Sequence, residues 1–225
     1  MALTLAFDVY GTLIDTQGIT AVLTDLLGAA DAPRFAKALR TKQLEYSFRR
    51  GLMRYYTTFA DCTRHALQYT CDALQLHLTE AQQELVLERY GQLPPFPEVA
   101  SALTRLQGTG LRLFAFSNGR REDVRSLLAQ AGLLDFMQEV VSVEEVRSFK
   151  PDPAVYAHFL RTAQVNTGSP AWLVSSNSFD VMGALAAGLG AAWVRRDPAE
   201  PSDPFGLTPT TVVPDLDALA SQLVS

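Results

Sequence analysis

The chain has 225 residues, of which 48% are hydrophobic and 19% charged, a balance typical of a folded globular protein and not of a disordered or fibrous one. Its 19 basic and 24 acidic residues give a net charge of −5. Because the basic residues are scattered along the chain, this charge argues against nucleic acid or an anionic membrane as a partner. A small anionic substrate stays compatible with it.

The two cysteines and the N-terminal segment indicate the cellular compartment in which the protein is expected. Cys62 and Cys71 lie nine residues apart in a predicted helix, a spacing beyond disulfide reach. The N-terminus lacks the basic and long apolar regions of a secretory signal, and the apolar residues 183–194 are too short and glycine-broken to span a bilayer. We therefore expect free thiols, no membrane partner and a cytoplasmic location.

The chain opens with a short strand and continues with a long helical stretch. An apolar run predicts the strand over residues 3–7. Between about residues 16 and 96 there is no strand-like alternation, and a proline-rich segment at residues 93–97 ends this part. The apolar spacing predicts helices over residues 22–27, 34–48, 55–76 and 80–90.

From about residue 97 onward, apolar β-type runs alternate with helical patterns. Strands are expected over residues 111–117, 140–143, 171–175 and 191–194, and helices over residues 124–131, 155–163 and 216–224. Such alternation predicts an α/β fold with a doubly wound, Rossmann-like parallel sheet covered on both faces. We expect a core of residues 1–15 and 97–225, with residues 16–96 inserted as a helical cap over the strand ends that bind ligands.

Polar side chains follow three of the predicted strands. Asp8 ends the first strand, Ser117 ends the second, and the polar run 175–180 follows a third. Each alone has an ordinary alternative as a helix N-cap, a turn or a loop residue. Because parallel strands finish at one edge of the sheet, however, all three sets can meet in one pocket.

Two charged residues give this pocket a chemistry. Asp8 enters a Tyr-Gly-Thr turn, and a buried aspartate in such a place can form a covalent ester with a substrate. Lys150 lies in a Phe-Lys-Pro-Asp turn before a predicted helix. Its ammonium would favour the charged form of Asp8 if it pointed at the strand ends, whereas an exposed lysine fits the sequence equally well.

These features resemble the haloacid dehalogenase superfamily, and within it the L-2-haloacid dehalogenases, over nearly the whole chain. The superfamily features are Asp-Val-Tyr-Gly-Thr-Leu from Asp8, Ser117, Lys150 before Pro-Asp, and Asp180. The features that separate dehalogenases from phosphatase relatives are Tyr10, residues 40–46 (Arg-Thr-Lys-Gln-Leu-Glu-Tyr) and residues 175–180 (Ser-Ser-Asn-Ser-Phe-Asp).

Two absent carboxylates indicate the same chemistry. A phosphatase of this superfamily uses an acid two residues after the nucleophile to protonate the leaving alkoxide, and it needs acidic ligands for Mg²⁺. Tyr10 stands at the first of these positions and Ser176 at a metal-binding one. Halide leaves as a stable anion and needs no proton, so we expect displacement at carbon with no metal and no cofactor.

The resemblance implies a two-step reaction on a small halogenated carboxylate. Asp8 would attack C2 of an L-2-haloacid with inversion, and water activated by Asp180 would hydrolyse the ester to a D-2-hydroxy acid. The catalytic residues so implied are Asp8, Thr12, Lys150, Ser175, Asn177 and Asp180. The substrate-binding residues are Val9, Tyr10, Arg40, Leu44, Phe59, Ser117, Asn118, Tyr156 and Phe179.

The implied roles divide the pocket into two ends. Ser117, with the backbone N–H groups of residues 9, 10 and 118, would hold the substrate carboxylate. Arg40 would receive the halide, with Phe179 on the same wall, although a solvent-exposed helix arginine is the ordinary alternative. Many relatives carry tryptophan where Phe179 stands, and this change bears on halide size.

Other expectations stay open beside this one. Relatives are commonly homodimers through the helical region, so the resemblance implies a homodimer. The alternatives are a Mg²⁺-dependent phosphatase of the same superfamily, a hydrolase of another activated carbon such as a strained ring amino acid, and a catalytically silent binding module.

Overall fold

A six-stranded parallel sheet forms the centre of the computed structural model, which describes residues 2–224. The strand order is β3-β2-β1-β4-β5-β6, and every neighbouring pair is parallel. β1 is buried at all five positions, as expected for a strand covered on both faces. The strands are β1 (Thr4–Asp8), β2 (Arg112–Ser117), β3 (Glu139–Ser142), β4 (Ala171–Ser175), β5 (Gly190–Val194) and β6 (Thr211–Val213).

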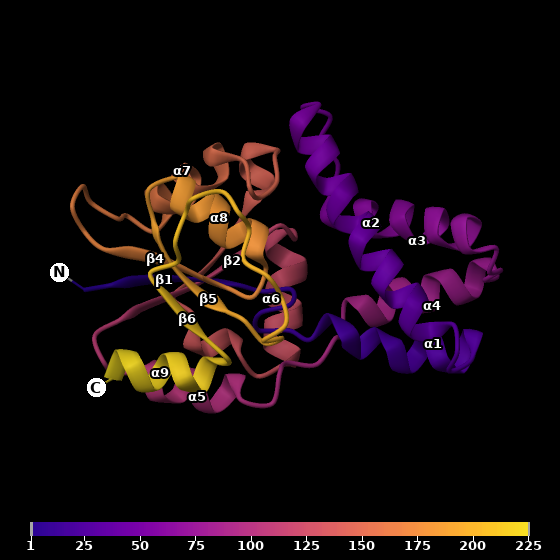
Figure 1. Cartoon of the computed structure of the whole chain (residues 1–225), viewed down its shortest axis with the longest axis horizontal. Helices are drawn as coiled ribbons and strands as arrows, with labels where there is room; N and C mark the ends of the chain where they lie inside the picture. Colours follow the sequence, from indigo (N-terminus) through magenta and orange to yellow (C-terminus); the bar gives the residue numbers. More distant parts are fainter. Residues whose placement is uncertain (1, 225) are drawn as a thin grey trace.

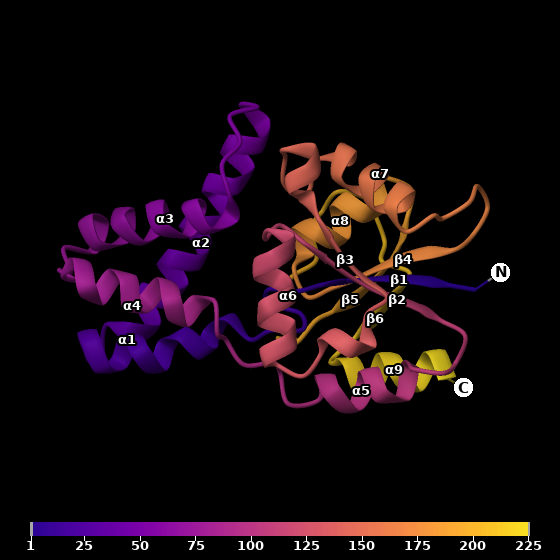
Figure 2. The same ribbon diagram turned by 180° about the vertical axis from the view of Figure 1, so that it is seen from behind.

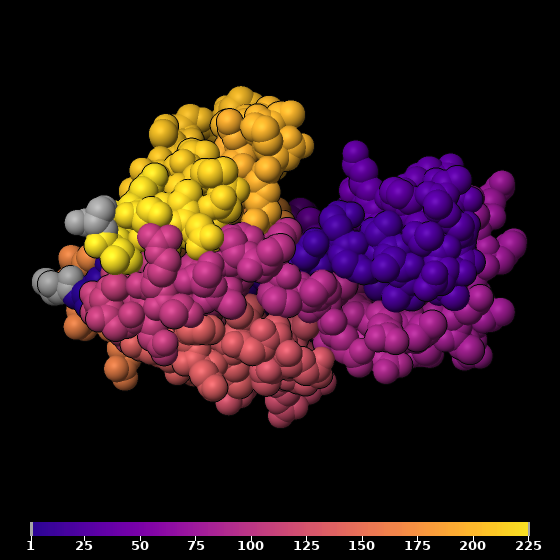
Figure 3. Space-filling model, turned by 90° about the horizontal axis from the view of Figure 1, so that it is seen from below, coloured from indigo at the N-terminus to yellow at the C-terminus, as the bar shows by residue number. Residues whose placement is uncertain are grey.

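Helices cover both faces of this sheet, which confirms the doubly wound α/β fold. One face carries α7 (Pro153–Thr162) and α8 (Ser178–Ala186), and the other carries α5 (Val99–Leu106), α6 (Arg121–Gln130) and α9 (Leu216–Val224) (Figure 1). Leu5 and Phe7 of β1 pack on the α5 side, whereas Ala6 packs on the α7 side. Figure 3 shows α9, in yellow, lying against α5.

Four further helices lie together beside the sheet, at the end where the strands finish (Figures 1 and 2). We call residues 19–90, which contain them, the helical group. Its helices are α1 (Ile19–Leu27), α2 (Ala32–Leu52), α3 (Phe59–Leu74) and α4 (Glu80–Tyr90). The chain begins and ends at the opposite end of the sheet, so the helical group faces the carboxyl ends of the strands. The division into a core and a cap, with its bounds, stays a prediction.

The sequence missed three short elements and misplaced one helix. β6 has three residues and α5 has eight, so neither gives a clear periodic signal, and α8 contains Gly183, which lowers helix propensity. The helix expected over residues 55–76 begins at Phe59. Arg54 turns the chain with a φ of 52°, and Thr58 then starts α3 through a capping box with Asp61.

Both cysteines are free and buried, in agreement with the expected absence of a disulfide. Burial raises the pKa of the Cys62 thiol to about 11. Within residues 2–224, no helix is long and apolar enough to cross a membrane.

Candidate active site

Asp8 lies at the carboxyl end of the central strand β1, beside the switch point between β1 and β4, where open α/β sheets bind ligands. The side chain is 9% exposed. Its Oδ2 accepts hydrogen bonds from Thr12 Oγ1 at 3.0 Å, Ser175 Oγ at 3.2 Å and Asn177 Nδ2 at 2.6 Å. Three donors from two strand ends therefore hold one carboxylate oxygen of Asp8 in place.

Lys150 reaches the other oxygen of Asp8 from the turn before α7. Its Nζ donates to Asp8 Oδ1 at 3.0 Å, to Asp180 Oδ2 at 2.7 Å and to the Phe116 carbonyl at 2.8 Å. The side chain is 1% exposed, which excludes the solvent-exposed alternative. Burial acts to lower the pKa of Lys150, but Asp180 and Asp8 outweigh it and raise the pKa above its usual value. The ammonium therefore stays charged between two carboxylates.

Asp180 lies in the first turn of α8 and is fully buried. Burial, reinforced by the nearby Asp8, raises its pKa to about 6 despite the opposing effect of Lys150. Its Oδ1 accepts a hydrogen bond from the Tyr156 hydroxyl at 2.7 Å. A carboxyl group with such a pKa is ionised at neutral pH but can still take up a proton, as a general base requires.

Tyr156, expected at the substrate, lies fully buried behind Asp180, its hydroxyl facing that carboxylate. Burial, with Asp180 next in effect, holds the Tyr156 pKa far above its usual value, so the hydroxyl keeps its proton and donates. Gly183 makes this contact possible, because a Cβ there would lie 2.3 Å from the Tyr156 hydroxyl oxygen. The structure thus places Tyr156 against a candidate catalytic group instead of against open space.

Arg40 comes from α2 of the helical group and meets the turn after Asp8. Its Nη2 donates to the Tyr10 carbonyl at 3.2 Å and to Asn177 Oδ1 at 3.4 Å. Asn177 Nδ2 donates to the same Tyr10 carbonyl at 3.0 Å. Gly11 beside them has a φ of 92°, a backbone conformation that glycine adopts readily and other residues rarely do. These contacts exclude the alternative that Arg40 is a solvent-exposed arginine on a helix surface.

The strand end of β2 supplies the polar groups expected to hold a substrate carboxylate. Ser117 is 1% exposed, and its Oγ accepts from the Gly119 N–H at 3.1 Å, so its own proton is free to donate. Asn118 Oδ1 instead accepts from the Lys150 N–H at 2.9 Å. Val9 lies in the buried turn between Asp8 and Tyr10.

The predicted apolar residues surround this polar centre from the helical group and α8. The ring of Phe59 lies 5.7 Å from that of Tyr10, and Phe179 packs edge-on against Phe48 at 5.0 Å. Leu44 is half-buried on α2. The roles of these residues in substrate binding stay predictions.

A sequence profile of haloacid dehalogenase-like hydrolases matches residues 3–188. The chain belongs to this family. It is similar to the haloacetate dehalogenase H-2 of Moraxella sp. (strain B), with 34% identity over 96% of this chain and 95% of that protein. It is also similar to the (S)-2-haloacid dehalogenase 2 of Pseudomonas sp. (strain CBS-3), with 34% identity over 96% of this chain and 93% of the relative.

The chain is also similar in three-dimensional structure to a solved member of the family. That member is an L-2-haloacid dehalogenase from Xanthobacter autotrophicus with chloropropionic acid covalently bound. The two chains are 31% identical and superpose with a TM-score of 0.90 over 99% of this chain and 98% of that one.

Gln43 belongs to the segment 40–46 that the sequence singles out, but sequence reasoning gave it no role of its own. It is fully buried in the helical group, where its Oε1 accepts from Arg40 Nη1 at 2.8 Å and from the Tyr90 hydroxyl at 3.0 Å. Its Nε2 donates to Thr63 Oγ1 at 2.6 Å. The amide thus fixes one arm of Arg40 against α3 and α4. Its signal in the sequence was a polar residue three places after Arg40, on the same helix face.

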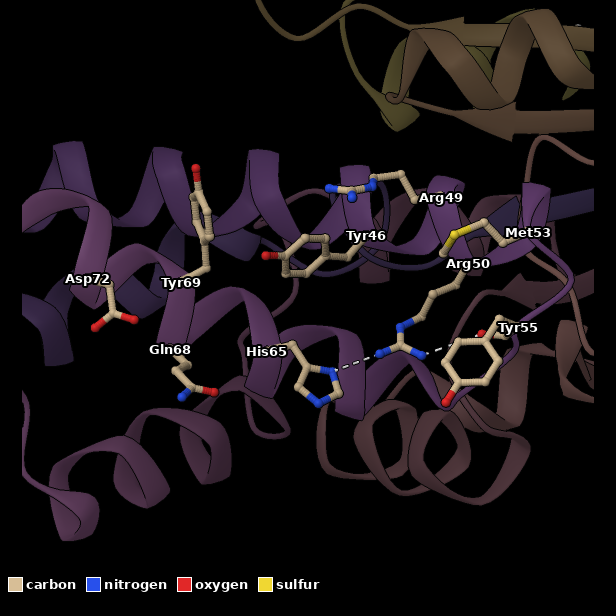
Figure 4. A pocket seen from close by; sticks show the side chains of 9 residues that line it. All are labelled: Tyr46, Arg49, Arg50, Met53, Tyr55, His65, Gln68, Tyr69 and Asp72. Atoms are coloured by element: carbon tan, nitrogen blue, oxygen red, sulfur yellow. Dashed lines mark hydrogen bonds between the residues drawn. The ribbon is translucent and has the colours of Figure 1, made fainter.

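The protein has two hollows near the helical group. A pocket of about 520 Å³ reaches from Tyr10 and Phe59 to Gly119, between α3, α4 and α6, and so borders the site. A groove of about 460 Å³ between α2 and α3 holds none of the predicted site residues. Figure 4 shows Arg50 there, reaching toward His65. Within residues 2–224 no three His, Cys, Asp or Glu side chains gather as a metal-binding group.

Proposed function

We propose that this chain is a hydrolytic (S)-2-haloacid dehalogenase, which converts L-2-haloalkanoic acids to D-2-hydroxy acids through an ester on Asp8 without a metal. The observation that carries the proposal is the buried Lys150 ammonium, which contacts both Asp8 and Asp180. The named activities of the relatives, and the covalently bound chloropropionic acid of the Xanthobacter autotrophicus protein, support it.

In the first step, a carboxylate oxygen of Asp8 forms a bond to C2 of the substrate. The carbon–halogen bond breaks on the opposite face, and its electron pair leaves with the halide, so C2 is inverted. Arg40 is held at the turn after Asp8, and its guanidinium stabilises the negative charge of the departing halide. Ser117 donates to the substrate carboxylate together with backbone N–H groups of the Asp8 turn.

In the second step, water attacks the carbonyl carbon of the ester, and Asp180 accepts the proton that the water loses. The tetrahedral intermediate then collapses, and the bond from that carbon to the product oxygen breaks. The leaving alkoxide takes the proton back, which gives the free 2-hydroxy acid and restores Asp8. Lys150 stabilises the negative charge on the Asp8 oxygens during this step.

Halide release with a chelator present tests the reaction class. With L-2-chloropropionate and excess EDTA, we expect one halide per D-lactate formed and no release from the D-enantiomer. Ion chromatography and chiral analysis of the product measure both. Phosphate release from a phosphomonoester that requires Mg²⁺, with no halide from the L-enantiomer, would instead indicate the phosphatase alternative.

The pKa of Asp180 predicts the acid limb of the pH profile. Because the base of the second step must be ionised and acts after the halide has left, kcat should rise with pH through about 6 and then level off where ester hydrolysis limits turnover. The Tyr156 hydroxyl lowers the Asp180 pKa by hydrogen bonding to the carboxylate. Tyr156→Phe should therefore move the acid limb of the pH profile to higher pH. The activity that this variant loses near neutral pH should largely return in alkaline buffer.

Tyr56→Phe is the matched control for this shift. The Tyr56 hydroxyl is also buried but has no hydrogen-bond partner among the described residues. Its removal should leave the limb in place. Coincident acid limbs for Tyr156→Phe and the unmodified protein would contradict the assignment of Asp180 as the base. The homodimer and the cytoplasmic location stay predictions beside this proposal.

A further inference from the structure

Two segments join the helical group to the rest of the chain, and they run side by side. Residues 13–18 lead into it and residues 91–98 lead out. The Asp15 N–H donates to the Pro94 carbonyl at 2.8 Å, and the Phe96 N–H donates to the Leu13 carbonyl at 3.1 Å. We call this pair of segments the linkers. Any shift of the helical group against the sheet must pass through them.

Arg196 contacts the linker of residues 91–98 and the Asp8 turn with one guanidinium. It lies two residues beyond β5, and its Nη2 donates to the carbonyl of Thr12 at 3.0 Å. Its Nη1 pairs with Glu98 Oε1 at 2.7 Å. The guanidinium also lies over the Phe96 ring, 3.6 Å from the centroid. The three contacts therefore join Thr12, in the turn after Asp8, to Phe96 and Glu98 of the linker that leaves the helical group.

The chemistry of this contact requires arginine. The ion pair is largely buried, with side-chain exposures of 22% for Arg196 and 17% for Glu98. A planar guanidinium can stack on a ring, donate to a carbonyl and face a carboxylate at the same time, whereas a lysine ammonium cannot do all three. Because a buried pair contributes little net stability, its geometry points to a role in fixing positions.

One hydrogen-bond route leads from this contact to Asp8, and the helical group reaches the same turn through Arg40. Thr12, whose carbonyl Arg196 holds, donates its hydroxyl to Asp8 Oδ2. On the other side of the linkers, Arg40 donates to the Tyr10 carbonyl, in the same turn. A change in the angle between linkers and turn would therefore separate Arg40 from the nucleophile that it faces.

We infer that Arg196 is a positioning residue, which fixes the linker of residues 91–98, and through it the paired linker of residues 13–18, on the Asp8 turn so that Arg40 of the helical group meets the nucleophile. This inference rests on the proposed function, because halide release is its readout. Arg196 touches no reacting atom and acts through Thr12 and the linkers.

Arg196→Lys keeps the charge and loses the stacking and one of the two directed contacts. We expect kcat for L-2-bromopropionate to fall roughly 10- to 100-fold, as for a small misplacement of a catalytic group, with KM changed less than about threefold. Arg121→Lys is the matched control, because Arg121 also pairs with two carboxylates, Glu139 and Glu145, but lies on α6 away from the linkers. It should leave kcat unchanged.

A double-mutant cycle with Arg40→Met separates positioning from general stability. If Arg196 acts by placing Arg40, Arg196→Lys should lower kcat much less in the Arg40→Met background than in the unmodified chain. Equal factors in both backgrounds would overturn the inference. Should Arg196→Lys fail to fold, Glu98→Gln serves in the same cycle, with the same pattern expected.

The failures of the two proposals are distinguishable. No halide release by the unmodified protein would contradict the proposed function. Full halide release by the unmodified protein together with an unchanged kcat in Arg196→Lys would contradict the positioning role alone.

Discussion

Asp8→Asn should lower halide release roughly 10⁴- to 10⁶-fold, the scale of loss when a covalent nucleophile is removed. An amide is a poor nucleophile. Its NH₂ group would also face the donors that now serve Asp8, namely Thr12, Ser175 and Asn177 on one oxygen and Lys150 on the other. Halide measured by ion chromatography under saturating L-2-chloropropionate tests this loss. Asp25→Asn, an exposed change on α1, is the control.

Isotope transfer tests the ester itself. In H₂¹⁸O with protein in excess over substrate, one turnover should place ¹⁸O in Asp8 and leave the product hydroxyl unlabelled. The solvent oxygen adds to the Asp8 carbonyl carbon, and an original Asp8 oxygen leaves with the product. Mass spectrometry of the peptide that contains Asp8 reads the label. Label in the product and none in the peptide would show direct attack by water and would contradict the covalent step.

Lys150→Met is the second change with a large expected effect. We expect kcat to fall by roughly 10³-fold, because the charge that forms on the Asp8 oxygens would lose its buried cation. Breaking a buried ion pair also costs about 3–5 kcal/mol of unfolding free energy. Halide release and urea unfolding, followed in parallel, separate the two effects.

The stability loss of Lys150→Met should depend on pH in a defined direction. Without the ammonium, Asp8 and Asp180 repel each other, so the pKa of Asp180 rises further above its value in the unfolded chain. A raised pKa in the folded state favours folding at low pH and loses that benefit as pH rises. The variant should therefore be least stable, relative to the unmodified protein, above neutral pH. Lys42→Met, which removes a half-buried lysine paired with Glu45 and distant in sequence from both carboxylates, should show no such trend. A loss of stability that is the same at acidic and alkaline pH would contradict this account.

The sequence predicted the sheet and the strand-end cluster because both follow from short-range patterns. Apolar runs mark each strand, and parallel strands finish at one edge, so Asp8, Ser117 and Ser175 had to meet if the sheet was parallel. Whether Lys150 pointed inward was left open by the sequence. Its burial depends on the turn before α7 and on two carboxylates that come from distant segments.

The contacts that sequence reasoning missed are those made between elements. Tyr156 was expected at the substrate, but the packing of α7 on α8, which Gly183 permits, turns its hydroxyl to Asp180. Arg40 was placed by resemblance alone, since periodicity does not say which helix lies over a strand end. The other partners of Gln43 and the Thr12 partner of Arg196 lie 20 or more residues away, and no local pattern encodes those contacts. The contact of Gln43 with Arg40, three residues apart, is the local exception.

The central place of β1 in the sheet has a consequence for synthesis. β1 pairs with β2 and β4, so about a hundred residues separate it from its first partner at Arg112. At typical rates of translation, this strand emerges roughly 5 to 20 s before any partner does. During this interval the apolar residues of β1 have no neighbouring strand to pair with. The helical group is made in this interval, so the growing chain must keep an unpaired strand, with Asp8 at its end, from aggregating.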